Sequence, residues 1–122
     1  MRRDRNLPKP LFWRGSSRAD FASFPVSVQR EMGYGLFLAQ MNERHETMAK
    51  TLKGFAGATV VELREQAAGG TYRAVYTVRF PDAVYVLHAF QKKSATGIKT
   101  SKADKDLIER RLRELIAEKE RR

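Results

Sequence analysis

Two arginines, one histidine and two lysines in the second half of the chain could together do chemistry on a phosphodiester. These residues are Arg64, Arg73, His88, Lys92 and Lys93. Guanidinium and ammonium groups bind phosphate oxygens and stabilise the negative charge that develops on them in a transition state. An imidazole titrates near neutral pH and can carry a proton in such a reaction. The residue types therefore fit cleavage of a nucleic-acid backbone, provided that the fold brings them together.

Three segments rich in valine and tyrosine predict the strands that position these residues. The segments are residues 59–66, 71–80 and 83–91. Residues 67–70, which include two glycines, and the pair Pro81 and Asp82 predict the turns between the strands. Turns this short join antiparallel strands, so we expect an antiparallel sheet.

The two turns set a register in which the candidate residues share one face of this sheet. Arg64 lies opposite Arg73, Arg73 lies opposite Phe90, and Val75 lies opposite His88. Two like charges side by side on neighbouring strands repel by roughly 0.2–1 kcal/mol. A phosphate between the two guanidinium groups would remove that repulsion. We therefore expect a solvent-facing, phosphate-binding face.

The opposite face of the sheet is expected to carry the core and to be covered by helices. Its predicted residues are Val61, Leu63, Tyr72, Ala74, Tyr76, Val78, Tyr85, Leu87 and Ala89. A capping signal at residues 16–20 and an apolar stripe over residues 25–44, begun by Pro25, predict two successive helices. A second stripe follows a cap at Thr100 or Ser101 and predicts a final helix. Residues 45–57 are expected to be mostly loop.

Each candidate residue also has a purely structural interpretation. Arg64 could pair with Glu62 or Glu65 on its own strand, and Arg73 could be a solvated strand residue. His88 lies in an almost wholly apolar strand, where a histidine is more often part of the core than a catalyst. Only the gathering of these residues on one face favours the functional interpretation.

A strip of lysines extends the positive charge beyond the predicted strands. It consists of Lys92, Lys93, Lys99, Lys102 and Lys105. Beside these lysines, Phe90 could stack on a base, as in proteins that bind single-stranded RNA, or it could simply pack. The net charge of +10 and the pI near 10.3 favour a polyanionic partner. The alternative is a basic domain that makes no use of nucleic acid.

The composition argues against several other kinds of site. The chain has no cysteine and only two histidines, and its carboxylates are dispersed, so we expect no metal site. It has no nucleotide-binding loop motif, and we expect no cofactor. RNA cleavage requires neither, because the substrate's own 2′-hydroxyl can attack the adjacent phosphorus. The sequence has no apolar run long enough to span a membrane and no signal peptide, so we expect a cytoplasmic protein without a membrane partner.

The length of 122 residues fits a single domain with one modest core. Residues 1–9 are expected to form a polar arm, and residues 10–122 the domain itself.

Several segments of the chain together resemble the RelE/ParE toxin superfamily, and most of all its HigB-like, phage-derived branch. The segments are LKG at 52–54, VELR at 61–64, YRAVY at 72–76, LHAFQKKS at 87–94 and GIKT at 97–100. The resemblance covers roughly residues 11–118. It implies an α+β fold with a short first strand, a two-helix hairpin, a curved antiparallel sheet of three further strands and a C-terminal helix.

The resemblance also implies a function. A protein of this kind is the toxin of a type II toxin–antitoxin system, a ribosome-dependent mRNA endonuclease that inhibits translation. A cognate antitoxin, expected to be a helix-turn-helix protein, neutralises it in a hetero-oligomeric complex. Carried over by position, the catalytic residues are Arg64, Arg73, Lys92 and Lys93, together with His88. The resemblance adds one more residue, Lys53, to the RNA-binding set of Phe90, Lys99 and Lys102.

Two alternatives remain open at this point. A ParE-like member of the same superfamily would inhibit DNA gyrase and cut no RNA. An inactive member would keep only a basic surface that binds the antitoxin.

Overall fold

The computed structural model describes residues 7–55, 59–92 and 100–121. Its elements follow one another as β1 (Leu11–Trp13), α1 (Ser17–Ala22), α2 (Val26–Gln40), β2 (Ala49–Leu52), β3 (Val60–Ala67), β4 (Gly70–Thr77), β5 (Val84–Lys92) and α3 (Lys102–Glu120). The strands form one sheet in the order β1-β5-β4-β3-β2. Strand β1 runs parallel to β5, and the other neighbours are antiparallel. The predicted α+β class, short first strand, helix pair, curved sheet and C-terminal helix are confirmed.

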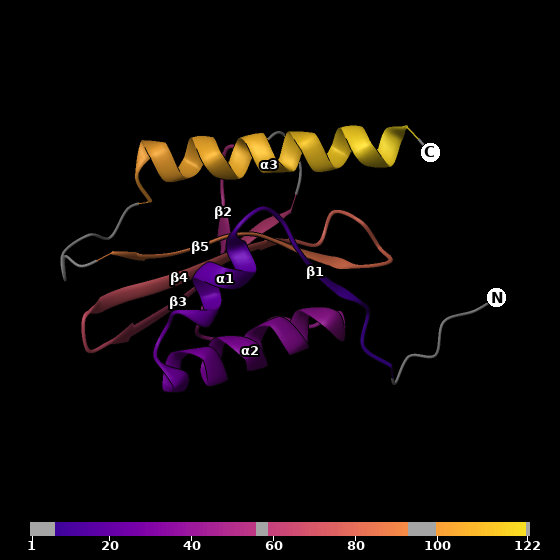
Figure 1. Ribbon diagram of the computed structural model, residues 1–122. Helices are drawn as coiled ribbons and strands as arrows, with labels where there is room; N and C mark the ends of the chain where they lie inside the picture. The colour runs from indigo at the N-terminus through magenta and orange to yellow at the C-terminus, as the bar shows by residue number, and fades with distance from the viewer. Residues whose placement is uncertain (1–6, 56–58, 93–99, 122) are drawn as a thin grey trace.

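Helices cover both faces of the curved sheet, with α1 and α2 on one side and α3 lying across the other (Figure 1). One core cluster lies between α2 and the sheet and includes Met32, Leu36 and Leu63. A second cluster, which includes Leu87 and Leu112, lies beneath α3. The expectation of a single helix-covered face is therefore wrong. The apolar stripe of α3 requires a sheet face of its own to bury, and it takes the one that was expected to meet solvent.

The predicted strand register is confirmed as far as the middle of β4. Arg64 pairs with Arg73, Arg73 with Phe90, and Val75 with His88. Beyond this point the register shifts by one residue, because Tyr76 pairs with Val86 and leaves Leu87 as an extra residue in β5. This β-bulge reverses the alternation of β5.

The bulge moves two predicted core residues to the other side of the sheet. Tyr85 and Leu87 pack in the cluster beneath α3, whereas Val84, Val86 and Ala89 pack against the side of α2. The set of residues predicted for one core face is thus divided between two faces.

Strand β2 was not expected, because it lies within residues 45–57, the predicted loop. It is an edge strand of four residues, partly exposed, that pairs with β3 from Ala49 to Leu52. Helix α2 ends at Gln40, four residues before the predicted end, and Asn42 follows it in a left-handed conformation with φ 63°. A residue of this conformation terminates a helix, and asparagine adopts it more readily than most.

The helix starts predicted at residues 16–20, at Pro25 and at Thr100 or Ser101 are confirmed, but the side chain of Ser16, the N-cap of α1, makes no capping hydrogen bond. Pro25 occupies the N-cap position of α2, and Ser101 caps α3 by accepting a hydrogen bond from the Asp104 backbone N–H. Of the expected N-terminal arm, residues 1–6 lie outside the described part of the chain. Lys9 is buried, and its backbone N–H donates to the carbonyl of Gln40 at the end of α2.

Candidate functional site

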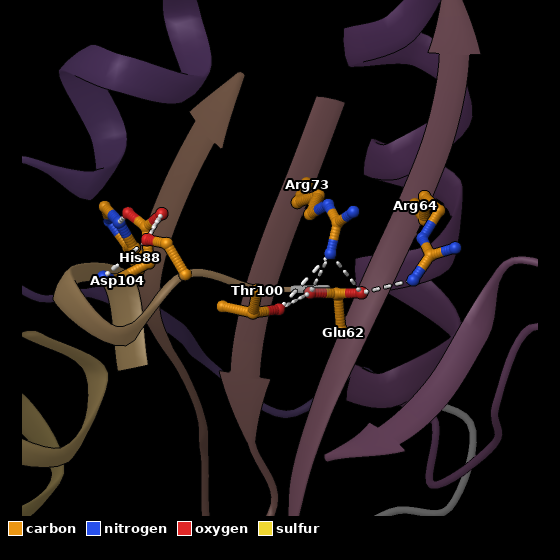
Figure 2. Close-up of polar contacts among 7 residues, drawn as sticks. Glu62, Arg64, Arg73, His88, Thr100 and Asp104 are labelled. Atoms are coloured by element: carbon orange, nitrogen blue, oxygen red, sulfur yellow. Dashed lines mark hydrogen bonds and ion pairs between the residues drawn. The ribbon is translucent and has the colours of Figure 1, made fainter. Parts of the chain in front are cut away.

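The two arginines that the sequence places side by side share one buried carboxylate, that of Glu62 (Figure 2). Arg64 Nη2 lies 3.3 Å from Glu62 Oε1. Arg73 Nη1 lies 3.3 Å from Glu62 Oε2. Strand alternation explains the arrangement, since residues 62 and 64 of β3 point to the same face and Arg73 lies on the neighbouring strand.

Glu62 supplies the negative charge that was expected to come from a bound phosphate. Arg73 is 0 % exposed and Glu62 is 1 % exposed, so the pair lies wholly inside the protein. The expectation that Arg73 lies on a solvent-facing surface is therefore wrong. The reason is that α3 and the residue before its cap cover this face of the sheet. Arg64 keeps a third of its side chain exposed.

Thr100 is the third side chain that contacts Glu62, and it also contacts Arg73. Its hydroxyl donates to Glu62 Oε2 over 2.9 Å and lies 3.2 Å from Arg73 Nη1, which donates to it. Thr100 is itself buried. Thr100, the residue before the capping Ser101, thus attaches the start of α3 to β3 and β4.

His88 makes a second connection between α3 and the sheet. Its Nε2 lies 2.8 Å from Asp104 Oδ1, and its ring stacks on that of Phe90 with 4.5 Å between ring centres. Burial tends to raise the pKa of the Asp104 carboxyl, but the hydrogen bonds from Ser101 and His88 outweigh it, and the pKa is lowered. His88 is 6 % exposed, and its Nδ1 is buried without a hydrogen-bond partner among the described residues. This geometry favours the core interpretation of His88.

Lysines from two distant segments meet beside the start of α3. Lys53, in the connection after β2, and Lys102 and Lys105, in the first turns of α3, line one shallow depression of about 360 Å³. Asp106 and Glu109 also line it, and Asp106 pairs with Lys102 across 3.0 Å. Lys102 is 89 % exposed, so this pair holds its ammonium group only weakly. The depression brings together two of the four residues that were predicted to bind RNA.

The other residues predicted to bind or cleave RNA on this side of the sheet do not line the depression, or they lie outside the described part of the chain. Lys92 ends β5 and is half-buried, and Phe90 is half-buried against His88 and the cluster beneath α3. Lys93 and Lys99 lie outside the described residues.

The sequence named Glu62 only as a possible partner of Arg64, and this pairing is confirmed. It did not indicate that Thr100 and Asp104 belong to the site. A signal for Glu62 was present, because an acid two residues before an arginine on a strand points to the same face. No comparable signal exists for Thr100 or Asp104, whose partners lie on strands distant in sequence.

Among the described residues, no group of three or more histidine, aspartate or glutamate side chains could hold a metal ion. Nor does any helix in the described part have the length and apolar character needed to cross a membrane.

Comparison with known families now identifies the chain. The family model described as "Phage derived protein Gp49-like" matches residues 19–113. The chain belongs to this Gp49-like family. The match agrees with the phage-derived branch to which the sequence is similar, and it spans α1 to the middle of α3, which includes every residue of the network around Glu62.

The solved structure of one toxin shows that the Gp49-like chain has the RelE fold. The free Escherichia coli toxin RelE, in a double arginine-to-alanine variant, is 15% identical with a TM-score of 0.52. That match covers 88% of this chain and 98% of RelE. The toxin–antitoxin complex RelBE2 from Mycobacterium tuberculosis contains a chain that is 18% identical with a TM-score of 0.48, covering 75% of this chain and 100% of that one. No curated protein matches this Gp49-like chain by sequence.

Proposed function

We propose that this protein is the toxin of a type II toxin–antitoxin system and that it cuts mRNA bound to the ribosome. One observation carries the proposal: Lys53, Lys102 and Lys105 converge on one depression although β3, β4 and β5 separate them in sequence. A cluster of exposed ammonium groups fits a chain of phosphates. The RelE fold of the Gp49-like family and the net charge of +10 support the same function.

The proposed reaction uses the substrate's own 2′-hydroxyl. The 2′-oxygen forms a bond to the adjacent phosphorus, and the bond from phosphorus to the 5′-oxygen breaks. The 2′-hydroxyl loses a proton and the leaving 5′-oxygen gains one, which gives a 2′,3′-cyclic phosphate and a 5′-hydroxyl end. No metal takes part in these steps. Cationic side chains stabilise the charge on the phosphoryl oxygens, and this electrostatic stabilisation is often the largest contribution to catalysis.

Arg64 is the arginine that we assign to the phosphoryl group. Its side chain is a third exposed, whereas that of Arg73 is buried and acts behind it. Lys92 and Lys93 complete the proposed cationic set. We assign His88 to fixing the first turn of α3, because its Nε2 contacts the Asp104 carboxylate and its ring stacks on Phe90.

The proposed partner is an acidic antitoxin of the helix-turn-helix type, in a hetero-oligomeric complex. A net charge of +10 on 122 residues would steer an acidic partner toward this surface and speed its association. Co-expression with the neighbouring gene product, followed by purification of the complex, tests this partnership.

The test of activity is cleavage of an mRNA by purified protein with and without programmed ribosomes, with the 5′ ends of the products mapped. We expect cuts only with ribosomes, and we expect Arg64→Ala to reduce them by about 10²-fold or more, as the loss of one transition-state contact does. Arg30→Ala, an exposed cation on α2 and so on the opposite side of the sheet, is the matched control. Cuts without ribosomes would indicate a free endoribonuclease. No cuts in either condition would refute the proposal.

A further inference from the structure

Glu62 is a carboxylate that the interior would not tolerate alone. It is 1 % exposed, and burying an ionised carboxyl group without partners costs several kcal/mol. Among the described residues, three side chains bind it: Arg64, Arg73 and Thr100 (Figure 2). Two of them come from the sheet and one from the residue that precedes the cap of α3.

The three partners differ in their access to solvent. Arg73 and Thr100 are buried, whereas a third of the Arg64 side chain is exposed. Of the three partners, only Arg64 is therefore accessible to a ligand in solvent. Two guanidinium groups and one carboxylate also carry a combined charge of +1, so the trio as a whole attracts anions.

Held by Glu62, the Arg64 guanidinium loses much of its rotational freedom before any ligand arrives. A planar guanidinium binds phosphate through a fixed fork of N–H donors, so its orientation decides how well it binds. Restricting the side chain in advance removes part of the entropy that binding would otherwise cost.

We propose that Glu62 is a positioning residue: it orients Arg64 toward a phosphate of single-stranded RNA, with Arg73 and Thr100 fixing Glu62 in turn. This inference rests on the proposed function for the identity of the ligand, and it concerns a residue that touches no RNA itself.

Positioning and bulk electrostatics predict opposite results when the charge of Glu62 is removed. Glu62→Gln makes the protein more positive by one charge, so electrostatics alone would tighten RNA binding. Loss of positioning would weaken binding instead. Glu65→Gln makes the same charge change on the same strand, but residue 65 lies on the opposite face of the sheet, opposite Tyr72. It is therefore the matched control.

The experiment measures the affinity of the purified, full-length protein for a single-stranded oligoribonucleotide by fluorescence anisotropy at one fixed salt concentration. We expect Glu62→Gln to weaken binding about tenfold, within the range measured for coupled neighbouring residues. Glu65→Gln should bind as tightly as the wild type or slightly more tightly. In the Arg64→Ala background, Glu62→Gln should have no further effect, because the residue that it orients is gone.

Circular dichroism of each variant shows whether it is folded, since Glu62→Gln leaves Arg73 buried beside a neutral partner. A second variant, Glu62→Met with Arg73→Met, removes both buried charges and leaves the net charge unchanged. Replacing a buried ion pair by apolar residues often preserves the fold. Its RNA affinity should fall as that of Glu62→Gln does.

The outcomes separate this inference from the proposed function. Wild-type or tighter binding by folded Glu62→Gln, or an equal loss in the Arg64→Ala background, would overturn the positioning role even if the protein cuts mRNA. Weakened binding that depends on Arg64 would support the role even if no mRNA is cut. Failure of the wild type to bind the oligoribonucleotide would overturn this inference, whereas the proposed function is decided separately by the cuts made in mRNA on ribosomes.

Discussion

At the scale of single residues, the ion pair of Glu62 and Arg73 gives the sharpest prediction for stability. Arg73→Ala leaves Glu62 with the partly exposed Arg64 and the uncharged Thr100 hydroxyl as partners. It should lower the free energy of unfolding by about 3–5 kcal/mol, which is typical when one partner of a buried pair is removed. Urea unfolding followed by circular dichroism measures this loss. The position on a polar face that the sequence predicts for Arg73 would instead have left the fold intact.

Arg64→Ala provides the comparison. It removes a guanidinium from the same carboxylate, but a third of the Arg64 side chain is exposed and the loss should stay below about 1 kcal/mol. If both alanine variants lose equal stability, then Arg73 is not the main residue that offsets the cost of burying the Glu62 carboxylate.

The pH dependence of stability tests the contact of Asp104 with Ser101 and His88. Burial acts to raise the pKa of this carboxyl, but the hydrogen bonds from Ser101 and His88, and the charge of Lys92, lower it overall. A carboxyl whose pKa is lower in the folded state contributes stability above its unfolded value, about pH 4, and loses that contribution as the pH falls through the folded value.

The stability difference between the wild type and Asp104→Asn should therefore shrink as the pH falls from about 5 to below about 4. Thermal unfolding across that range measures the difference. A difference that grows as the pH falls would contradict the direction of the pKa shift.

At the scale of elements, two glycines of α2 test how closely this helix packs on β3. A Cβ at residue 35 would come within 2.9 Å of Leu63 Cδ2, whereas a Cβ at residue 33 would meet nothing within 4 Å. Alanine is favoured over glycine within a helix by about 0.5–1 kcal/mol, so Gly33→Ala should stabilise the protein by that amount.

Gly35→Ala has the same gain in helix propensity but must displace the fully buried Leu63 side chain. It should be less stable than Gly33→Ala by about 1–3 kcal/mol, the usual cost of overpacking a core. Differential scanning calorimetry of the two variants measures this difference. The gain in helix propensity is the same in both variants and cancels in the comparison. Equal melting temperatures would show that the Leu63 side chain can move to accommodate a Cβ at residue 35 without a measurable cost in stability.

At the scale of the whole molecule, the sequence predicts the features that depend on residues close together in the chain. It does not predict the features that depend on contacts between residues far apart in the chain. Turn length sets the pairing of Arg64 with Arg73, and this pair is confirmed. Val75 pairs with His88 as expected, but only after the bulge has shifted the register found beside the turn between β4 and β5. The bulge at Leu87 could not be predicted, because residues 83–87 are all apolar and alternation among them carries no information.

The burial of Arg73 was unpredictable for a related reason. The strand pattern placed its side chain on the correct face, but what covers that face is Thr100, 27 residues later. Lys53 and Lys102 show the same dependence on the fold. Both were predicted to bind RNA, and only the packing of α3 beside the connection after β2 brings them to one depression.

The salt dependence of RNA binding tests whether this depression, rather than the overall charge, holds the substrate. Each phosphate contact to single-stranded nucleic acid contributes about 0.7 to the slope of log affinity against log salt concentration. Lys53→Ala and Lys102→Ala should each lower the slope by about that amount. Arg30→Ala removes the same charge from α2, on the opposite side of the sheet, and should leave the slope unchanged. If all three variants lower the slope equally, then a diffuse positive field binds the RNA and the depression is no site. If only the two lysine variants do so, the backbone of the RNA passes over the depression between the connection after β2 and the start of α3.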